Sequence, residues 1–436
     1  MSTALSELGP YPRSLFYVLL TGLLFRVFFI ALHERPLISD ERAYDQLAYN
    51  LAANASYNSD GVPTAYRPIG YPAFVGVVYF LAGHHPQAIK YLQAVADVLT
   101  ALVLFLLLAG YPVRVRLIAA GLWILYVPAI LFTNFLLSET IFTLVLIINA
   151  FLLTRRTTDT ISTILVGMCC GVLILMKPGV VVFLALALLI LPRLHRSLWK
   201  MYPAMIAFLL IAVPWSARNY SVFGTASLSS NGGINLLIGN NPKTTGAYSI
   251  KFDSTKFQST ISEFDADRTA FRWATRYITG HPGRFLVNGV RKLARLFESE
   301  GGLLVWTFHP NPEDTLTRYA TKYRSIALAW MLVTNLPFFI ILLLGVFGFL
   351  AAERDPLWWL VVCLFAGWLI LHFVFFGGGR FHFPLIPFFA AYAAMFLGDG
   401  KTTVKTLPAS QWFVGGFVSL ILISIWVAEG IVVYNG

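Results

Sequence analysis

Two adjacent carboxylates, Asp40 and Glu41, follow the first apolar segment of the chain after only a few residues. This position puts them at a membrane surface. A hydroxyl acceptor must lose its proton as it attacks, and a carboxylate near the lipid boundary can have its pKa raised enough to take that proton. We therefore predict that Asp40 is a general base. The structural alternative is a helix over 40–52 that Ser39 caps and whose dipole the two acids complement.

Arginines occur in two turns that Gly and Pro make stiff or open. Arg67 lies in YRPIGYP, where its guanidinium suits a phosphate fork, and a lipid-phosphate leaving group needs such a cation as its bond breaks. Arg380 follows three glycines in GGGRFHFP, which permit a close approach of the backbone to a ligand. His382 is a candidate to support it. The alternatives are an interfacial anchor for Arg67 and a hydrogen-bonded structural role for His382.

Four more ionisable residues lie in or near apolar segments, where each costs a few kcal/mol if it faces lipid. Glu139 lies at the end of its segment on the same side as Asp40, and we expect it to orient Asp40, the acceptor or sugar hydroxyls. Lys177 lies at the same surface, where its ammonium can meet a phosphate. Arg26 and Asp97 lie deeper, and we interpret each as part of a pair between helices.

The elements that position these residues are membrane helices. The chain is 57% hydrophobic and only 12% charged, and its apolar runs are near the roughly 20 residues that a helix needs to cross a bilayer. We predict an all-α polytopic membrane protein with about eleven transmembrane helices. The run 71–83 is short and is interpreted as an interfacial helix or a twelfth span. The spans are predicted near 14–33, 87–110, 117–134, 139–154, 161–177, 179–192, 201–215, 326–350, 356–375, 383–398 and 411–433.

The positive charge of the chain reflects its membrane topology. The formal net charge is +11, but the basic residues are scattered between the spans, so we expect no nucleic-acid partner. The three cysteines lie inside apolar runs and form neither a disulfide framework nor a metal-ligand pattern. Basic residues of the short loops all fall on one side, which predicts the cytoplasmic side. They are Arg114, Arg116, Arg155, Arg156, Arg193, Arg196, Lys200, Arg354, Lys401 and Lys405.

The candidate residues accordingly face the outside. We predict that 1–436 forms a single transmembrane domain with two large outer loops: 34–86, a catalytic loop with interfacial helices, and 216–325, with amphipathic helices. Within the second loop, the segments 262–282 and 284–298 read as helices. The latter has Leu286, Val290, Leu293 and Phe297 on one face and Arg284, Arg291, Lys292 and Arg295 mostly opposite, which predicts an interfacial helix beside anionic headgroups or a membrane-resting brace.

A series of motifs in this order resembles the GT-C glycosyltransferases, in particular the bacterial branch akin to the protein O-mannosyltransferases and the lipid A aminoarabinose transferase. The motifs are SDERAYDQLAYNLA, YRPIGYPAF, LLSETIF, PWSARNYSVFG, NGGINLLIGNNP, HPGRFLVNGVRKLARL and RFHFPLIPF. The resemblance spans most of the chain. It implies a GT-C-type fold and inverting transfer of a sugar from a polyprenyl-phosphate donor to a hydroxyl-bearing acceptor, at the outer face of the bacterial inner membrane.

The resemblance also implies roles for single residues. Asp40 would activate the acceptor, with Glu41 and Glu139 as supporting acids, and Arg67, Lys177 and Arg380 would lie near the donor phosphate. Tyr66, His382, Arg218 and Asn240 are expected to support the site or to shape the loops. Tyr66-Arg67 stands where the aminoarabinose branch has an acidic residue and a lysine, so the acceptor stays open among a glycolipid, lipopolysaccharide, a wall glycan and a protein. We expect membrane lipids as partners, no cofactor and no required metal.

Two other classes of protein share some of these features. A transporter or flippase of lipid-linked sugars also has many spans and buried charges, but it predicts charges at the bilayer midplane, whereas the candidates here gather at one surface. A glycan polymerase or ligase uses the same carrier but would place its main functional loop late in the chain. A scaffold role would leave four charged residues on one face unexplained.

Overall fold

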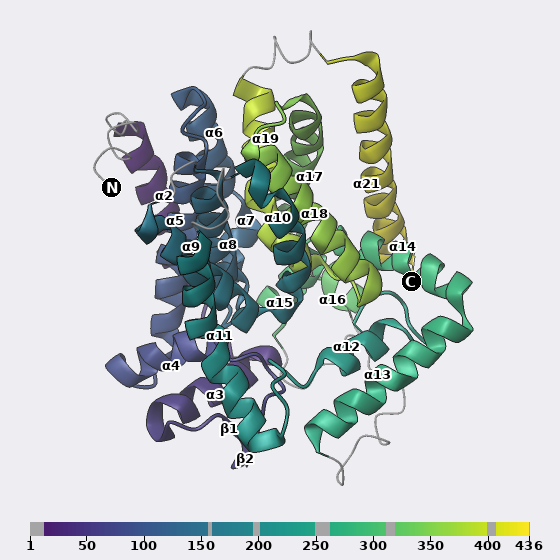
Figure 1. Cartoon of the computed structure of the whole chain (residues 1–436). Helices are drawn as coiled ribbons and strands as arrows, with labels where there is room; N and C mark the ends of the chain where they lie inside the picture. The colour runs from purple at the N-terminus through teal and green to yellow at the C-terminus, as the bar shows by residue number, and fades with distance from the viewer. Residues whose placement is uncertain are drawn as a thin grey trace.

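The computed structural model describes residues 13–155, 159–194, 201–248, 262–310, 319–398 and 407–435. These residues are almost entirely helical, and the one sheet among them is a two-stranded hairpin (Figure 1). The predicted all-α architecture is therefore confirmed. Of the basic residues that predicted the orientation, Arg156, Arg196, Lys200, Lys401 and Lys405 lie outside the described residues.

Seven of the described helical segments are long and apolar enough to cross a membrane. Shorter apolar helices and a broken pair of helices run beside them, so the chain is an integral, multi-pass membrane protein. The long segments are α2 (Arg13–Leu32), α5 (Pro86–Leu107), α11 (Tyr202–Phe223), α17 (Leu328–Ala351), α18 (Pro356–Val374), η5 with α19 (Gly379–Leu385 and Ile386–Gly398) and α21 (Ala409–Asn435). The shorter ones are α8 (Glu139–Thr154), α9 (Thr160–Met176) and η1 with α10 (Pro178–Val180 and Val181–Leu194).

The span predicted over 117–134 is broken in two, into α6 (Val113–Ile124) and α7 (Val127–Phe132). Pro128 has no N–H to donate to the carbonyl of Ile124, so the helix cannot continue through it. Arg26 donates to that carbonyl at 3.3 Å and also pairs with Asp97 at 2.5 Å. The predicted deep pairing between helices is confirmed. Arg26 also supplies a donor to the Ile124 carbonyl, which the break in the neighbouring helix leaves without its usual partner.

The span predicted over 201–215 is longer than expected. It continues as α11 through Pro214 to Phe223 and ends at Gly224, whose φ of +69° favours glycine in the left-handed region. The segment between α11 and α17 therefore begins near 224, not at 216. Arg218 is consequently on the last turns of a long apolar helix and not in a loop.

Two groups of short elements lie at the same end of the bundle (Figure 1). Between α2 and α5 come α3 (Asp40–Asn54), the hairpin β1 (Asn58–Ser59) and β2 (Val62–Pro63), and α4 (Gly70–Ala82), which packs on α3. With 13 residues α4 is about 20 Å long, too short for a hydrocarbon core of about 30 Å. Between α11 and α17 come α12 (Gly232–Gly239), α13 (Glu263–Gly280), α14 (Pro282–Leu296), α15 (Gly301–Phe308) and α16 (Tyr319–Arg324).

The two helices predicted in the second segment are confirmed as α13 and α14, which are separated at His281. One side chain departs from the predicted pattern. Lys292 was expected on the solvated face of α14, but it is fully buried. Its ammonium donates to Asn240 and to the carbonyls of Phe373 and Val374, at 2.9, 3.2 and 2.9 Å, and these acceptors stabilise an amine inside the protein.

Candidate active site: a carboxylate between two arginines

Asp40 lies between two arginines from distant parts of the chain. Arg67 Nη2 donates to Asp40 Oδ1 at 2.9 Å, and Arg380 Nη1 donates to Asp40 Oδ2 at 2.9 Å. Asp40 is the first residue of α3, Arg67 precedes α4, and Arg380 lies in η5. The structure thus brings together three residues that the sequence marked separately, and both oxygens of the carboxylate are bound.

The backbone just before Asp40 is strained. Ser39 has a φ of +47°, which is rare for a residue with a side chain and costs about 1–3 kcal/mol. Its hydroxyl makes no capping hydrogen bond, so the predicted capping role of Ser39 is wrong. Such strain persists only where surrounding contacts hold it in place, and here those contacts come from Glu41, two residues after Ser39.

Glu41 points away from Asp40 into a buried ion pair. Arg35 donates to both of its oxygens at 2.7 and 2.8 Å, and the backbone N–H groups of Ile38 and Leu136 add bonds of 3.1 and 2.8 Å. Each oxygen of the Glu41 carboxylate thus accepts two hydrogen bonds. The structure therefore does not bring Glu41 to the two arginines that bind Asp40. Its contacts fix the start of α3, which sets the direction of Asp40.

A second ion pair lies beside this centre. Lys177, at the end of α9, donates to Glu139, at the start of α8, at 3.0 Å. The ammonium lies 5.9 Å from the ring of Phe381, and the guanidinium of Arg380 lies 4.9 Å from the same ring. Glu139 and Arg380 also attract each other. The site therefore holds three cations and two carboxylates, with Glu139 beside Lys177 and not against Asp40.

The charge of Asp40 follows from these partners. Burial would raise its pKa, but Arg380 and Arg67 outweigh burial and lower the pKa to about 2. The raised pKa that a membrane-surface position predicted is therefore wrong for this arrangement, because the arginines stabilise the carboxylate. The pKa of Asp40 can rise only if Arg67 and Arg380 bind another anion in its place.

Aromatic rings flank both guanidinium groups. The guanidinium of Arg67 lies 5.2 Å from the ring of Tyr44 and 5.9 Å from that of Tyr66, and Arg380 also lies 5.7 Å from the ring of Trp306. Such contacts hold a guanidinium in place without using its N–H donors. Tyr44 and Trp306 were missed in the sequence. For Tyr44 a signal existed, since it follows Asp40 by one helical turn on the same face.

Part of the segment between α11 and α17 also reaches the site. The carbonyl of Gly246 accepts from the N–H of Gly377 at 2.9 Å, and this contact carries Tyr248 against Phe376, with ring centroids 5.6 Å apart. Tyr248 interacts electrostatically with Asp40 and with both arginines, although burial is the larger cause of its raised pKa. Nothing in the sequence singled out this tyrosine.

Three predicted supporting residues have structural partners instead. His382 is buried and bonds to Glu300 and to the carbonyl of Leu296, at 2.9 and 2.8 Å, which is the hydrogen-bonded alternative. Arg218 donates to the carbonyls of Thr64 and Tyr57 at 2.8 and 2.9 Å and so holds the segment between α2 and α5 in place. Asn240 accepts from Lys292 and ties α12 to the end of α18. Within the described ranges, no group of three His, Cys, Asp or Glu could hold a metal ion.

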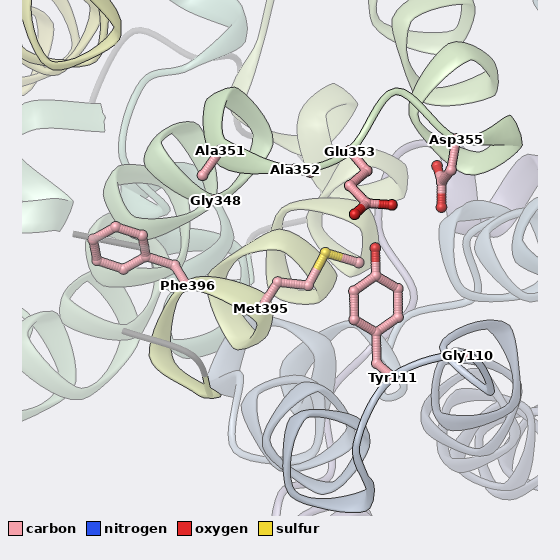
Figure 2. Close-up of a pocket in the computed structure, with 9 residues that line it drawn as sticks. All are labelled: Gly110, Tyr111, Gly348, Ala351, Ala352, Glu353, Asp355, Met395 and Phe396. Carbon is pink, nitrogen blue, oxygen red and sulfur yellow. The ribbon is translucent and has the colours of Figure 1, made fainter. Parts of the chain in front are cut away.

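A pocket of about 420 Å³ lies at the other end of the bundle (Figure 2). Tyr111, Glu353 and Asp355 line it together with Met395 and Phe396, at the junctions of α5 with α6 and of α17 with α18. Asp355 accepts from the N–H of Trp358 at 2.8 Å and caps α18. This pocket is separate from the centre at Asp40.

Comparisons with known proteins show a similarity of fold. No family model and no curated protein matches the sequence. The fold is similar to the crystal structure of ArnT from Cupriavidus metallidurans bound to undecaprenyl phosphate, with a TM-score of 0.52 and 12% identity over 92% of this chain and 61% of ArnT. The archaeal oligosaccharyltransferase AglB from Archaeoglobus fulgidus, in complex with an inhibitory peptide and a dolichol-phosphate, gives a TM-score of 0.49 and 14% identity over 95% of this chain and 54% of AglB.

The chain spans about three fifths of the length of ArnT. Since the identity to ArnT is 12%, the similarity shows the fold alone. The fold is of the GT-C type, as the series of motifs predicted.

Proposed function

We propose that this protein is an inverting glycosyltransferase that moves a sugar from a polyprenyl-phosphate donor to a hydroxyl-bearing acceptor. The observation that carries the proposal is the Asp40 carboxylate held between Arg67 and Arg380 in a GT-C-type fold. The undecaprenyl phosphate bound to ArnT supports a lipid phosphate as the donor class. We further propose that the site faces outward from a bacterial inner membrane, with 34–86 as the catalytic loop. The second outer loop is the segment predicted at 216–325, which in the structure begins near 224.

The cations recognise the donor. A phosphodiester placed beside Arg67 and Arg380 attracts both guanidinium groups, whose N–H forks match phosphate oxygens. As the bond between the anomeric carbon and the phosphate oxygen breaks, its electron pair passes to the phosphate, and the arginines stabilise the charge that develops there. Lys177 is the third cation in this region, and its ion pair with Glu139 keeps its ammonium in position.

Contacts between the donor phosphate and the two arginines also convert Asp40 from an ion-paired carboxylate into a base. A phosphate that draws Arg67 and Arg380 away removes the charges that keep the pKa of Asp40 low, while burial of the carboxylate remains and raises it. Asp40 then takes the proton of the acceptor hydroxyl. The acceptor oxygen bonds to the anomeric carbon on the face opposite the phosphate, so a single displacement inverts the configuration and releases polyprenyl phosphate.

The acceptor is proposed to be a glycolipid, lipopolysaccharide, a wall glycan or a protein. A flippase or transporter of lipid-linked sugars is the alternative, and the location of the charges weighs against it. In the deep pair, Arg26 donates to Asp97 and to the carbonyls of Gly22 and Ile124, so the pair has a structural role at the break between α6 and α7. The charges of the candidate site, on Asp40, Arg67, Glu139, Lys177 and Arg380, lie instead at one end of the bundle.

The test is mass spectrometry of lipids that co-purify with the protein in mild detergent. We expect wild-type protein to retain a polyprenyl phosphate or its sugar ester, and Arg67→Ala and Arg380→Ala to lose it. Arg354→Ala is the matched control, because it removes an exposed arginine from the opposite end of the bundle. Equal retention in all four proteins, or none in wild-type protein supplied with undecaprenyl phosphate, would overturn the proposal.

A further inference from the structure

Helix α14 has three distinct faces. Lys292, Leu296 and Gly289 form a buried face against the rest of the protein. Leu286, Val287 and Val290 form an exposed apolar face, with 59%, 55% and 65% of each residue accessible. The third face is a basic stripe of Arg284, Arg291 and Arg295, which are seven and four residues apart and therefore share one side of the helix.

The C-terminal end of α14 is fixed at the end of a membrane span. Trp426 of α21 donates to the carbonyl of Phe297 at 2.9 Å. The carboxylate of Glu429, one turn further along α21, accepts from the N–H and the hydroxyl of Ser299 at 2.7 and 2.8 Å. Figure 1 shows α14 beside the C-terminal end of α21.

The depth of this end in the membrane follows from α21 itself. Val427, Ile431 and Val432 are 56%, 55% and 66% exposed on the same helix turns as Glu429, so apolar side chains continue outward past that contact. Such exposure in a membrane span indicates lipid. Because α14 ends beside this lipid-facing surface, we place its exposed apolar face at the boundary between hydrocarbon and headgroups.

We infer that the exposed side of α14 is a binding surface for anionic phospholipids, and that an occupied surface holds Arg380 in position. An interfacial helix places its apolar face among acyl chains and its basic residues among headgroups. Arg284 and Arg291 are exposed and match the charge of such headgroups. The ligand is thus an anionic diacyl lipid at the membrane face that carries Asp40.

A chain of contacts leads from the basic stripe to the active site. Arg295 donates to one oxygen of Glu298 at 3.2 Å, and the other oxygen accepts from the N–H of Gly379 at 3.2 Å. The next residue, Arg380, binds Asp40. Two residues on from Glu298, Glu300 binds His382. The short linker after α14 therefore holds both sides of the turn that carries the active-site arginine.

The buried face of α14 holds the beginning of the same segment. Lys292 donates to the carbonyls of Phe373 and Val374. Gly377 packs so tightly on the Lys292 carbonyl that a Cβ at 377 would come within 1.9 Å of it. The segment 373–382 is thus attached to α14 at both ends, and α14 cannot change its depth without moving Arg380.

The binding test measures lipid retention and does not depend on the proposed function. The protein is reconstituted in nanodiscs of phosphatidylcholine with phosphatidylglycerol, extracted in mild detergent, and its bound lipids are quantified. We expect the double variant Arg284→Gln and Arg291→Gln to retain several-fold less phosphatidylglycerol than wild type. The control carries Arg272→Gln and Arg276→Gln on α13, an equal loss of charge, and should match wild type. Equal retention by both double variants would overturn the inference.

The coupling to Arg380 rests on the proposed function, so its test uses donor turnover in nanodiscs with and without phosphatidylglycerol. Wild-type turnover is expected to rise several-fold with phosphatidylglycerol. Glu298→Gln should retain the lipid but lose this rise, because the contact with Arg295 is weakened. A rise that survives in Glu298→Gln would disprove the coupling. Absence of turnover from every protein and membrane would instead count against the proposed function, and the retention result would stand by itself.

Discussion

Two arginine–carboxylate clusters in this molecule have opposite characters. The deep pair, Arg26 and Asp97, is closed, with side-chain exposures of 0% and 1%, and Arg26 uses further donors on backbone carbonyls. The cluster at Asp40 is open, with exposures of 23% for Asp40, 21% for Arg67 and 27% for Arg380. A closed pair can only stabilise the fold, whereas an open cluster can exchange one anion for another. Accessibility, not the residue types, separates a structural ion pair from a candidate active site.

The sharpest test of the comparison replaces the open carboxylate. Asp40→Asn keeps the shape of the side chain but cannot take a proton, so turnover is expected to fall about 10²–10⁴-fold. Retention of polyprenyl phosphate should persist, because Arg67 and Arg380 remain. Transfer assays and lipid mass spectrometry on the purified variant measure both quantities, and normal turnover would remove Asp40 from the role of base.

The closed pair should respond in stability instead. Asp97→Ala leaves Arg26 buried without its partner, which is expected to cost about 3–5 kcal/mol. The thermal unfolding midpoint in detergent should fall sharply, while the same change at the open cluster, Asp40→Ala, should lower it far less. Comparable losses in the two variants would contradict the distinction between the clusters.

The arginines of the open cluster should act through their geometry as well as their charge. Arg380→Lys keeps the charge but loses the planar fork, so donor affinity is expected to fall about tenfold, or about 1.4 kcal/mol. Titration with undecaprenyl phosphate in nanodiscs measures this change. Arg354→Lys at the opposite end of the bundle is the control and should bind as wild type does.

Two carboxylates beside Arg380 should change stability with pH in opposite directions. The pKa of Asp40 is lowered to about 2, so its contribution is present above its usual value near 4 and is lost as the pH falls through 2. Burial, helped by Glu429, raises the pKa of Glu298 to about 7, so folding is favoured at low pH and stability declines as the pH rises from about 4.5 to 7. Unfolding midpoints from pH 5 to 8 should show this decline in wild type, and Glu298→Gln should reduce it.

The smallest expected effect concerns the ring beside Arg67. Tyr44→Leu removes an aromatic face worth about 0.5–1 kcal/mol to a guanidinium, so donor affinity should fall about two- to fivefold. Tyr44→Phe keeps the ring and should bind nearly as wild type does. If the two variants weaken binding equally, the hydroxyl of Tyr44, and not its ring, is what Arg67 or the donor needs.

Sequence alone determined the architecture of this protein and the main candidates of its site. Apolar runs of near 20 residues indicate membrane helices, and Asp40, Arg67 and Arg380 stood out because their side chains suit proton transfer and phosphate binding at one membrane surface. The deep pair was predictable because a charge in lipid needs a partner. Even the helix over 284–298 followed from its periodic pattern.

Only the tertiary structure decided which charge meets which. Asp40 and Arg380 are 340 positions apart, and no local pattern specifies a contact over that distance. Glu41 and Glu139 were predicted as supporting acids for Asp40, yet they pair with Arg35 and Lys177 instead. The pKa of Asp40 was mispredicted because it depends on those partners and not on depth alone. Side-chain pairing is set by how helices pack, and packing is a property of the whole chain.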